Sequence, residues 1–394
     1  MAQLYGGKLL ATGSKSCVIH PNIHCNNNKY KKRSKKLISK IVFGDTAKEY
    51  STREKNINDM IRRIPGYKKW ALIFDELCKP PSLNDSISID KDISKCLEED
   101  TFELHSGIER KKQKLFDKNS IMLIGDYGGI TLGDYFSKHF ENLKDIKHLE
   151  KNFLDCMIKI DPIFRGLVDL QRYNIIHLDI KPNNIVMHGN SFKFIDFGLS
   201  NKVNETNHFL RRSMNEFKTA RVYVWYPLEY IFFNATKQEL ELEKQKIDVD
   251  GIDGFRNHMS MYNYINNFFG RNTINDVNSI IKQCNKNNKD KFIKEHYSDL
   301  IKGVDTYSFG MLMPFLFFTN ELLEYVEKSE ILTEFFTLFR DMCQPYYENR
   351  LKIDQAYILF KILLEKYTKK KNTKKQNKKK TRKKTKTRRN KNRK

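Results

Sequence analysis

The sequence predicts an α+β protein, with a small strand-rich N-terminal part and a larger helical C-terminal part. The apolar segments at residues 9–20, 35–44 and 69–77 are typical of strands, and the residues at 50–64 and 153–174 are typical of helices. The chain has 394 residues, 39% of them hydrophobic, which is enough for two such parts and a sizeable core. Residues 369–394 form a basic tail that cannot bury a core and is expected to be disordered.

The N-terminal part is expected to contain five strands and one helix. The helix is predicted over residues 50–64, because Ile57, Met60 and Ile61 fall on one side and Pro65-Gly66 ends it. The strands are predicted at residues 9–20 (a strand, a tight turn and a second strand), 35–44, 69–77 and 120–126. The polar stretch at about 78–118 is expected to be an insertion.

In the C-terminal part, an apolar helix at residues 153–174 leads to the segment HLDIKPNNIVMHGNSFKFIDFG, residues 177–198. Within it, the apolar stretches IVM and FKFI flank the turn HGN, which predicts a hairpin. A hairpin brings its two ends together, so Asn184 and Asp196 are expected to face one another.

These polar residues suit phosphate chemistry. Two facing oxygen-bearing side chains, Asn184 and Asp196, fit magnesium, a hard cation that binds one or two protein oxygens alongside phosphate. Asp179 and Lys181 then lie beside the bound phosphate. Asp179 is able to orient a hydroxyl group, and Lys181 is able to neutralise charge.

The pattern H-x-D-x-K-x-x-N, followed by D-F-G, resembles the catalytic and metal-binding loops of the serine/threonine protein kinases. The abundance of Lys, Asn and Ile makes the chain similar to a divergent branch of that family, the kinases of large DNA viruses. The resemblance implies a bilobal fold with ATP between the lobes, an N-lobe at 1–125 and a C-lobe at 126–368 with an insertion at about 235–300. It also implies structural support from His177, Glu229 with its partner Arg350, and Asp305, in segments similar to A-P-E and D-x-W-S-x-G.

The resemblance extends to the expected nucleotide site of the N-lobe. Lys40 corresponds to the strand lysine that holds the α- and β-phosphates, and Glu54 to the helix glutamate that pairs with it, with Glu49 as the alternative. Asn58 stands where the family usually has an apolar residue. The other positions expected to contact the nucleotide are Ala11, Gly13 and Ser16 in the glycine-rich loop, Val18 and Ile38 over adenine, and the hinge residues Asp126 and Tyr127, which follow the small gatekeeper Gly125.

The expected activity is transfer of the ATP γ-phosphoryl group to a serine or threonine of a protein substrate, with ATP and Mg²⁺ bound. Asp179 would accept the hydroxyl proton and Lys181 would neutralise the moving phosphoryl group. The incomplete glycine loop leaves a pseudokinase, a binding scaffold without catalysis, as an alternative. A small-molecule kinase shares H-x-D, but it is not expected to carry Lys181, D-F-G and the later segments together.

Charge and cysteine content bear on partners and location. Residues 369–394 hold 17 Lys or Arg and no acid, which leaves +7 of the net +24 for residues 1–368. Such a tail is expected to bind nucleic acid or another polyanion. The seven cysteines are odd in number and contain no C-x-x-C pair, which argues against a disulfide framework and for a reducing compartment. We expect an intracellular protein of cytoplasm or nucleus (host cell or virion if viral), without a signal peptide or transmembrane segment.

Overall fold

Two units make up the chain, and each is described by itself. The sheet unit comprises Met1–Thr131, His177–Asp179 and Asn184–Lys202, and the helical unit comprises the remaining residues. The structure, a computed structural model, describes residues 8–13, 16–25, 33–82, 84–86, 118–141, 143, 145–205, 224–227, 229–232, 259–271, 275–276, 279 and 289–369. Most of the two predicted insertions and the tail beyond residue 369 therefore lie outside the described residues. The predicted division into a strand-rich N-terminal part and a helical C-terminal part is confirmed.

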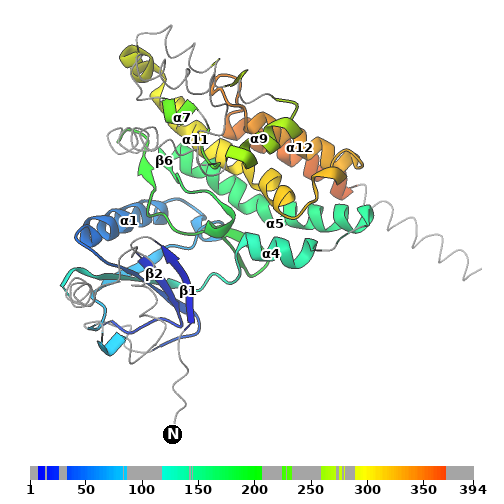
Figure 1. Ribbon diagram of the computed structural model, residues 1–394. Helices are drawn as coiled ribbons and strands as arrows, with labels where there is room; N and C mark the ends of the chain where they lie inside the picture. Colours follow the sequence, from blue (N-terminus) through cyan, green and yellow to red (C-terminus); the bar gives the residue numbers. More distant parts are fainter. Residues whose placement is uncertain are drawn as a thin grey trace, which may run out of the picture. The chain divides into compact units, whose positions relative to one another are not determined.

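The sheet unit is built on a five-stranded antiparallel sheet in the order β1-β2-β3-β5-β4 (Figure 1). Its strands are β1 (Lys8–Gly13), β2 (Ser16–His20), β3 (Leu37–Val42), β4 (Phe74–Cys78) and β5 (Ile121–Asp126). Successive side chains of a strand point to opposite faces, so the sheet has two faces of different composition. One packs around Ile41, Met122 and Ile124. The other packs around Val42, Ala47 and Leu123.

Helix α1 (Ala47–Arg62) packs against the Val42 face, with contacts to β3, β4 and β5. Ile57 and Ile61 are buried as predicted, and Met60 is half-buried. Glu54 and Asn58 are buried on this helix as well. The helix ends before Gly66, whose φ of +77° is a left-handed conformation that glycine adopts without strain.

The expectation that the cysteines form no disulfides is wrong for three of them. Cys25 and Cys78 are disulfide-bonded, with their Cα atoms 5.9 Å apart, and Cys17 on β2 is disulfide-bonded as well. Cys25 and Cys78 both pack against the Ile41 face, so the fold brings together two residues that are 53 positions apart. The intracellular location stays a prediction, but the cysteine content no longer supports it.

The helical unit contains long helices and short connecting elements (Figure 1). Helices α11 and α12 lie side by side, and ring contacts among Phe153, Phe317, Phe335 and Phe336 tie α5, α11 and α12 into one core. The elements are α4 (Leu132–Phe140), α5 (Ile146–Arg172), β6 (Ile175–Ile176), α7 (Glu229–Phe232), α9 (Met259–Phe268), α11 (Lys289–Thr319), η5 (Leu323–Tyr325), α12 (Glu330–Met342) and a last helix at 353–369.

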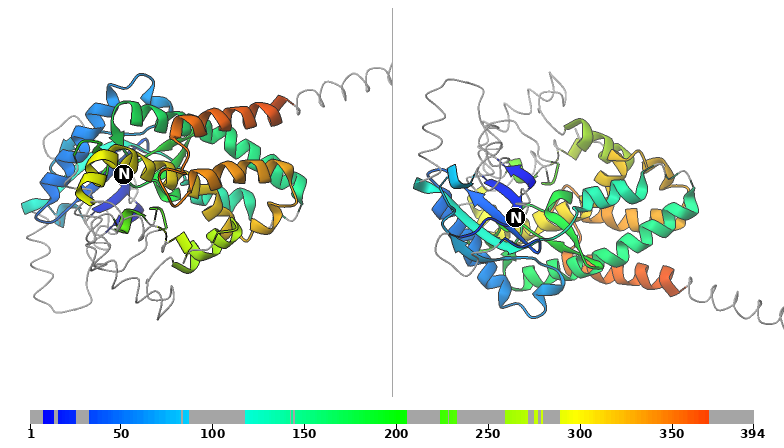
Figure 2. Two further views of the ribbon diagram at one scale, coloured as in Figure 1. Left: turned by 90° about the horizontal axis from the view of Figure 1, so that it is seen from above. Right: turned by 90° about the horizontal axis from the view of Figure 1, so that it is seen from below.

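The last helix packs along α5 (Figure 2). The rings of Phe164 and Phe360 lie 4.9 Å apart, and Lys361 donates to Asp161 over 2.9 Å. Helix α11 begins at Lys289, inside the segment predicted to be an insertion, and its buried residues include Leu300, Ile301 and Val304. Among the described residues, no helix combines the length and the apolar character needed to cross a membrane.

Candidate active site

The predicted hairpin is present and carries the candidate site at its two ends. Strands β7 (Ile185–His188) and β8 (Ser191–Phe194) pair in the register Ile185↔Phe194, and the turn between them contains Gly189 with a φ of +65°. Beyond the strands, the backbone N–H of Ile195 donates to the Asn184 carbonyl over 3.0 Å. This bond brings the backbone of Asn184 next to that of Asp196, as the hairpin predicted.

Asn184 holds the Asp179 carboxylate. The Asn184 amide nitrogen donates to Asp179 Oδ2 over 2.7 Å and to the Asp179 carbonyl over 2.9 Å. Both residues are buried. Because the amide nitrogen faces Asp179, the amide oxygen of Asn184 is the atom left to accept a cation.

Lys40 of β3 joins Glu54 of α1 to Asp196. Its ammonium lies 2.9 Å from Glu54 Oε2 and 2.7 Å from Asp196 Oδ1. The Lys40 and Glu54 side chains are only 8% and 3% exposed, whereas that of Asp196 is 39% exposed. Glu54 is thus the partner of Lys40, and Asp196 is the member of this triad that is open to a ligand. Glu49, the alternative partner, is exposed.

The ionisation of the triad follows from its burial and its charges. Burial alone would lower the pKa of Lys40, but the two carboxylates, Asp196 first, raise that pKa above its usual range. Burial raises the pKa of Glu54, and the charge of Lys40 opposes only part of the rise. Burial also acts to raise the pKa of Asp196, yet the charge and hydrogen bond of Lys40 outweigh it, so that this pKa lies below its usual value. A charged Asp196 is the form that binds a cation.

His177 is buried behind the loop. Its Nδ1 accepts from the Asp179 backbone N–H over 3.3 Å, and its ring lies 4.8 Å from that of Phe197. The Ser200 hydroxyl donates to the His177 carbonyl over 3.0 Å. Burial lowers the pKa of His177, and the nearby charge of Asp179 offsets only part of this effect. These contacts tie His177 to the backbone at Asp179 and to Ser200, and its role as a structural support stays a prediction.

Two residues of the site have left-handed backbone conformations. Leu178 and Asp196 both have a φ of 59°. For a residue other than glycine this conformation costs about 1–2 kcal/mol, so the surrounding hydrogen bonds must hold it. The contacts that hold these two conformations also fix the backbone at Asp196 and next to Asp179.

The other residues predicted to contact the nucleotide lie on the five-stranded sheet or directly after it. Ala11 and Gly13 on β1 pair with Val18 and Ser16 on β2, and residues 14–15 of this turn lie outside the described residues. Ile38 is opposite Gly125. The backbone N–H of Tyr127 donates to the Lys36 carbonyl over 2.8 Å, so this group is not open to adenine. Contact of Asp126 and Tyr127 with the nucleotide through other backbone groups stays a prediction. The Asp126 side chain is exposed.

Sequence reasoning missed Arg53. This residue precedes Glu54 on α1, and its guanidinium donates to the Gly198 carbonyl over 2.9 Å. It therefore ties the helix to the loop that carries Asp196. No motif marks an arginine at this position, because the contact joins residues 145 positions apart.

Within the helical unit, Glu229 and Arg350 form the predicted pair. Arg350 Nη2 lies 2.7 Å from Glu229 Oε1, and both side chains are buried. Burial raises the pKa of Glu229 despite the charge of Arg350. Asp305 on α11 is fully buried, and Lys181, which also belongs to this unit, is half-buried.

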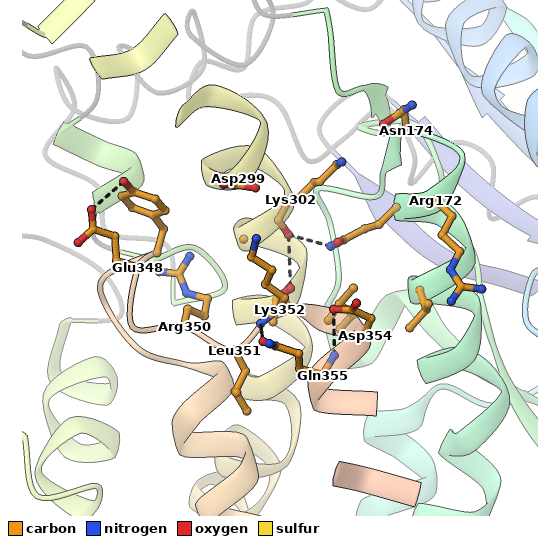
Figure 3. Close-up of a pocket in the computed structure, with 16 residues that line it drawn as sticks. Arg172, Asn174, Asp299, Lys302, Glu348, Arg350, Leu351, Lys352, Asp354 and Gln355 are labelled. Carbon is orange, nitrogen blue, oxygen red and sulfur yellow. Dashed lines mark hydrogen bonds between the residues drawn. The ribbon is translucent and has the colours of Figure 1, made fainter. Parts of the chain in front are cut away.

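Arg350 also lines a cavity of about 720 Å³ among α5, α11 and the segment before the last helix (Figure 3). At its wall, Gln171 Nε2 donates to the Lys302 carbonyl over 2.9 Å. The other charged side chains that line the cavity are of both signs: Arg172, Lys302, Lys352, Asp299, Glu348 and Asp354. The cavity therefore does not favour a ligand of one charge.

Magnesium fits the residues at the hairpin ends. No group of three or more His, Cys, Asp or Glu that would hold a metal ion by itself occurs among the residues that the structure describes. Magnesium does not need such a group, since it is usually bound by one or two protein oxygens together with phosphate and water. The Asn184 amide oxygen and the Asp196 carboxylate supply that number.

Comparison with known proteins finds similarity to the family that the motifs resemble. A family model described as the protein kinase domain matches residues 101–231. The chain is 30% identical over 129 residues to the provisionally named serine/threonine-protein kinase 040L of Invertebrate iridescent virus 3. The matched segment is 29% of this chain and 38% of that protein. It is 32% identical over 83 residues to mitogen-activated protein kinase 13 of Arabidopsis thaliana, 21% of each chain. The chain thus spans less than half the length of these relatives, and its resemblance to protein kinases, a viral one among them, is confirmed.

Proposed function

We propose that this chain is a protein kinase that transfers the γ-phosphoryl group of ATP to serine or threonine hydroxyls of a protein. The observation that carries the proposal is the buried Lys40, whose ammonium bridges Glu54 and Asp196, in the same unit as the Asp179–Asn184 pair. A cation and two anions at this spacing, together with the Asp179 carboxylate that Asn184 holds, suit the positioning of a triphosphate and of an attacking hydroxyl.

In this mechanism the substrate hydroxyl oxygen attacks the γ-phosphorus, the bond to the β–γ bridging oxygen breaks, and ADP leaves. Asp179 accepts the hydroxyl proton, held in place by Asn184. Lys40 holds the α- and β-phosphates, and Lys181 neutralises charge on the moving group. Magnesium, bound by Asn184 and Asp196, would neutralise phosphate charge. The position of Lys181, two residues after Asp179, is the feature that resembles serine/threonine kinases.

The test uses the full chain with labelled ATP, magnesium and a mixture of basic and acidic proteins, followed by phosphoamino-acid analysis. We expect phosphoserine or phosphothreonine, and a loss of at least about a hundredfold in rate for Asp179→Asn. Asp155→Asn, which changes an exposed carboxylate on α5, is the matched control and should keep the rate.

ATP binding by calorimetry separates the alternatives. A wild-type chain that binds ATP but labels no protein is a pseudokinase, and one that labels only small hydroxyl compounds is a small-molecule kinase. Either result overturns the proposal. Asp196→Ala should weaken the dependence of ATP binding on magnesium, whereas Asp179→Asn should leave it nearly unchanged, because Asp196 is assigned to the metal and Asp179 is not.

We also propose that residues 369–394 bind a polyanion. The support is the density of 17 basic residues among 26, without any acid. Binding of nucleic acid, acidic protein or anionic membrane would then be a property separate from phosphoryl transfer.

A further inference from the structure

A bulge in β4 turns Phe74 toward the face of the sheet that carries Lys40. Phe74 pairs with Gly125 and Glu76 with Ile124, so Asp75 is an extra residue opposite β5. Phe74 and Leu77 are three residues apart and would point to opposite faces of a regular strand. With the bulge, both pack against the Val42 face. Bulges next to active sites often redirect a side chain in this way.

Gly125 leaves the space that Phe74 occupies. A Cβ atom at position 125 would lie 3.0 Å from Cδ1 of the Phe74 ring, which is closer than a side chain normally tolerates. Ile38, Gly125 and Phe74 are opposite one another on three neighbouring strands. Because Gly125 of β5 has no side chain, the Phe74 side chain of β4 covers this part of the face.

The ring also reaches the charged centre of the site. The Lys40 ammonium lies 5.8 Å from the centroid of the Phe74 ring, within the range of a cation–π contact. The bulge is held from α1: Arg62 donates to the Phe74 carbonyl over 3.4 Å and to Asp75 over 3.0 Å. Phe74 is thus fixed by its backbone and packed between Gly125 and Lys40.

We propose that Phe74 is a specificity-determining residue, which closes the nucleotide site beside Gly125 and limits the substituents that a purine base can carry. The inference rests on the proposed function, in which the base lies against Ile38 and contacts the backbone that follows Gly125. A base in that place directs its hydrogen-bonding edge toward β5. Groups attached to the 6-amino nitrogen then meet the Phe74 ring.

The test compares the dissociation constants of ATP and of ATP with a benzyl group on the 6-amino nitrogen. We expect the wild type to bind the benzyl compound at least about tenfold more weakly than ATP, and Phe74→Ala to remove that difference. The double variant Phe74→Ala/Gly125→Phe moves the ring from β4 to β5. It should again bind the benzyl compound more weakly than ATP. Phe74→Val serves if Phe74→Ala does not fold. Leu77→Ala, on the same strand and in the same apolar cluster, is the matched control and should keep the wild-type ratio.

A second readout does not depend on nucleotide. Gly125→Phe alone should lower the thermal midpoint strongly, because its side chain meets the Phe74 ring, and the added Phe74→Ala should recover much of the loss. If the wild type binds no ATP, the proposed function fails and this inference falls with it. If ATP binds but Phe74→Ala excludes the benzyl compound as the wild type does, or if Leu77→Ala admits it equally, this inference alone fails.

Discussion

Burial of the Asn58 amide on α1 lowers the stability of the folded chain. The residue is fully buried one turn after Glu54, and neither polar atom of its amide has a hydrogen-bond partner among the described residues. A buried polar group without a partner costs about 1–3 kcal/mol. We expect Asn58→Leu to raise the free energy of unfolding by about this amount, since leucine has a similar size and no polar atom.

Urea unfolding measures the effect, and Asn56→Leu is the control, because Asn56 is exposed on the same helix and should change stability by less than about 0.5 kcal/mol. A loss of stability in Asn58→Leu would show that the amide is satisfied in solution.

His177 makes stability depend on pH. Burial holds its pKa in the folded chain below the value of about 6.5 expected for the unfolded chain. Between these two values the unfolded state binds more protons, so the contribution is complete above about pH 6.5 and falls as the pH decreases toward the folded pKa. Protonation at Nδ1 would also remove the acceptor for the Asp179 N–H.

The measurement is the urea midpoint at pH 7.5 and 5.5. His177→Gln, which does not titrate, should reduce the difference between the two midpoints relative to the wild type. His148→Gln is the control, because the His148 side chain is 68% exposed. Equal pH dependence in wild type and His177→Gln would contradict the assignment.

At the scale of elements, the disulfide joins β4 to the segment after β2. Removing a native disulfide typically costs about 2–4 kcal/mol, mainly because the unfolded chain regains freedom. We expect the double variant Cys25→Ala/Cys78→Ala to lose about this much stability. Alkylation of the unfolded but unreduced chain is the check: Cys156 and Cys343, which are free, should be labelled, and Cys25 and Cys78 should not. Labelling of all four cysteines would refute the bond.

Elements formed by neighbouring residues were predictable, and contacts that depend on sheet register were not. The hairpin at 185–194 and helix α1 follow from local apolar patterns and turn residues, and the structure contains both. The Cys25–Cys78 bond depends on the order of the strands, which no local pattern specifies. Phe74 could not be placed beside Gly125, because one extra residue at Asp75 decides which face it joins.

The candidate site shows the same limit. Asn184 and Asp196 lie at the two ends of one hairpin, so their proximity was predictable from the hairpin alone. Lys40 and Asp196 are 156 positions apart, and only the resemblance to a known family joined them before the structure did. Arg53 and Phe74 have no counterpart in the motifs, so neither was found.

At the scale of the whole molecule, the positive charge is concentrated at one end of the sequence. The 17 basic residues of 369–394 leave +7 for the rest of the chain, in which Lys40 and Arg350 are buried in ion pairs with Glu54 and Glu229. The proposed phosphoryl transfer uses residues outside the tail. Binding of polyanions and transfer of phosphate should therefore be separable.

Deletion of residues 369–394 should remove most binding to DNA and RNA while the rate of peptide phosphorylation changes little. Contacts with phosphates release counterions, so a tail that makes six to ten of them should lose about 10³–10⁵ in affinity between 50 and 200 mM salt. Electrophoretic mobility shifts at several salt concentrations measure this dependence. A tail of the same length with Lys and Arg replaced by Gln is the matched control, and it should behave as the deletion does, because the charge and not the length is responsible. If the truncated chain binds with unchanged affinity and salt dependence, the polyanion site lies on residues 1–368.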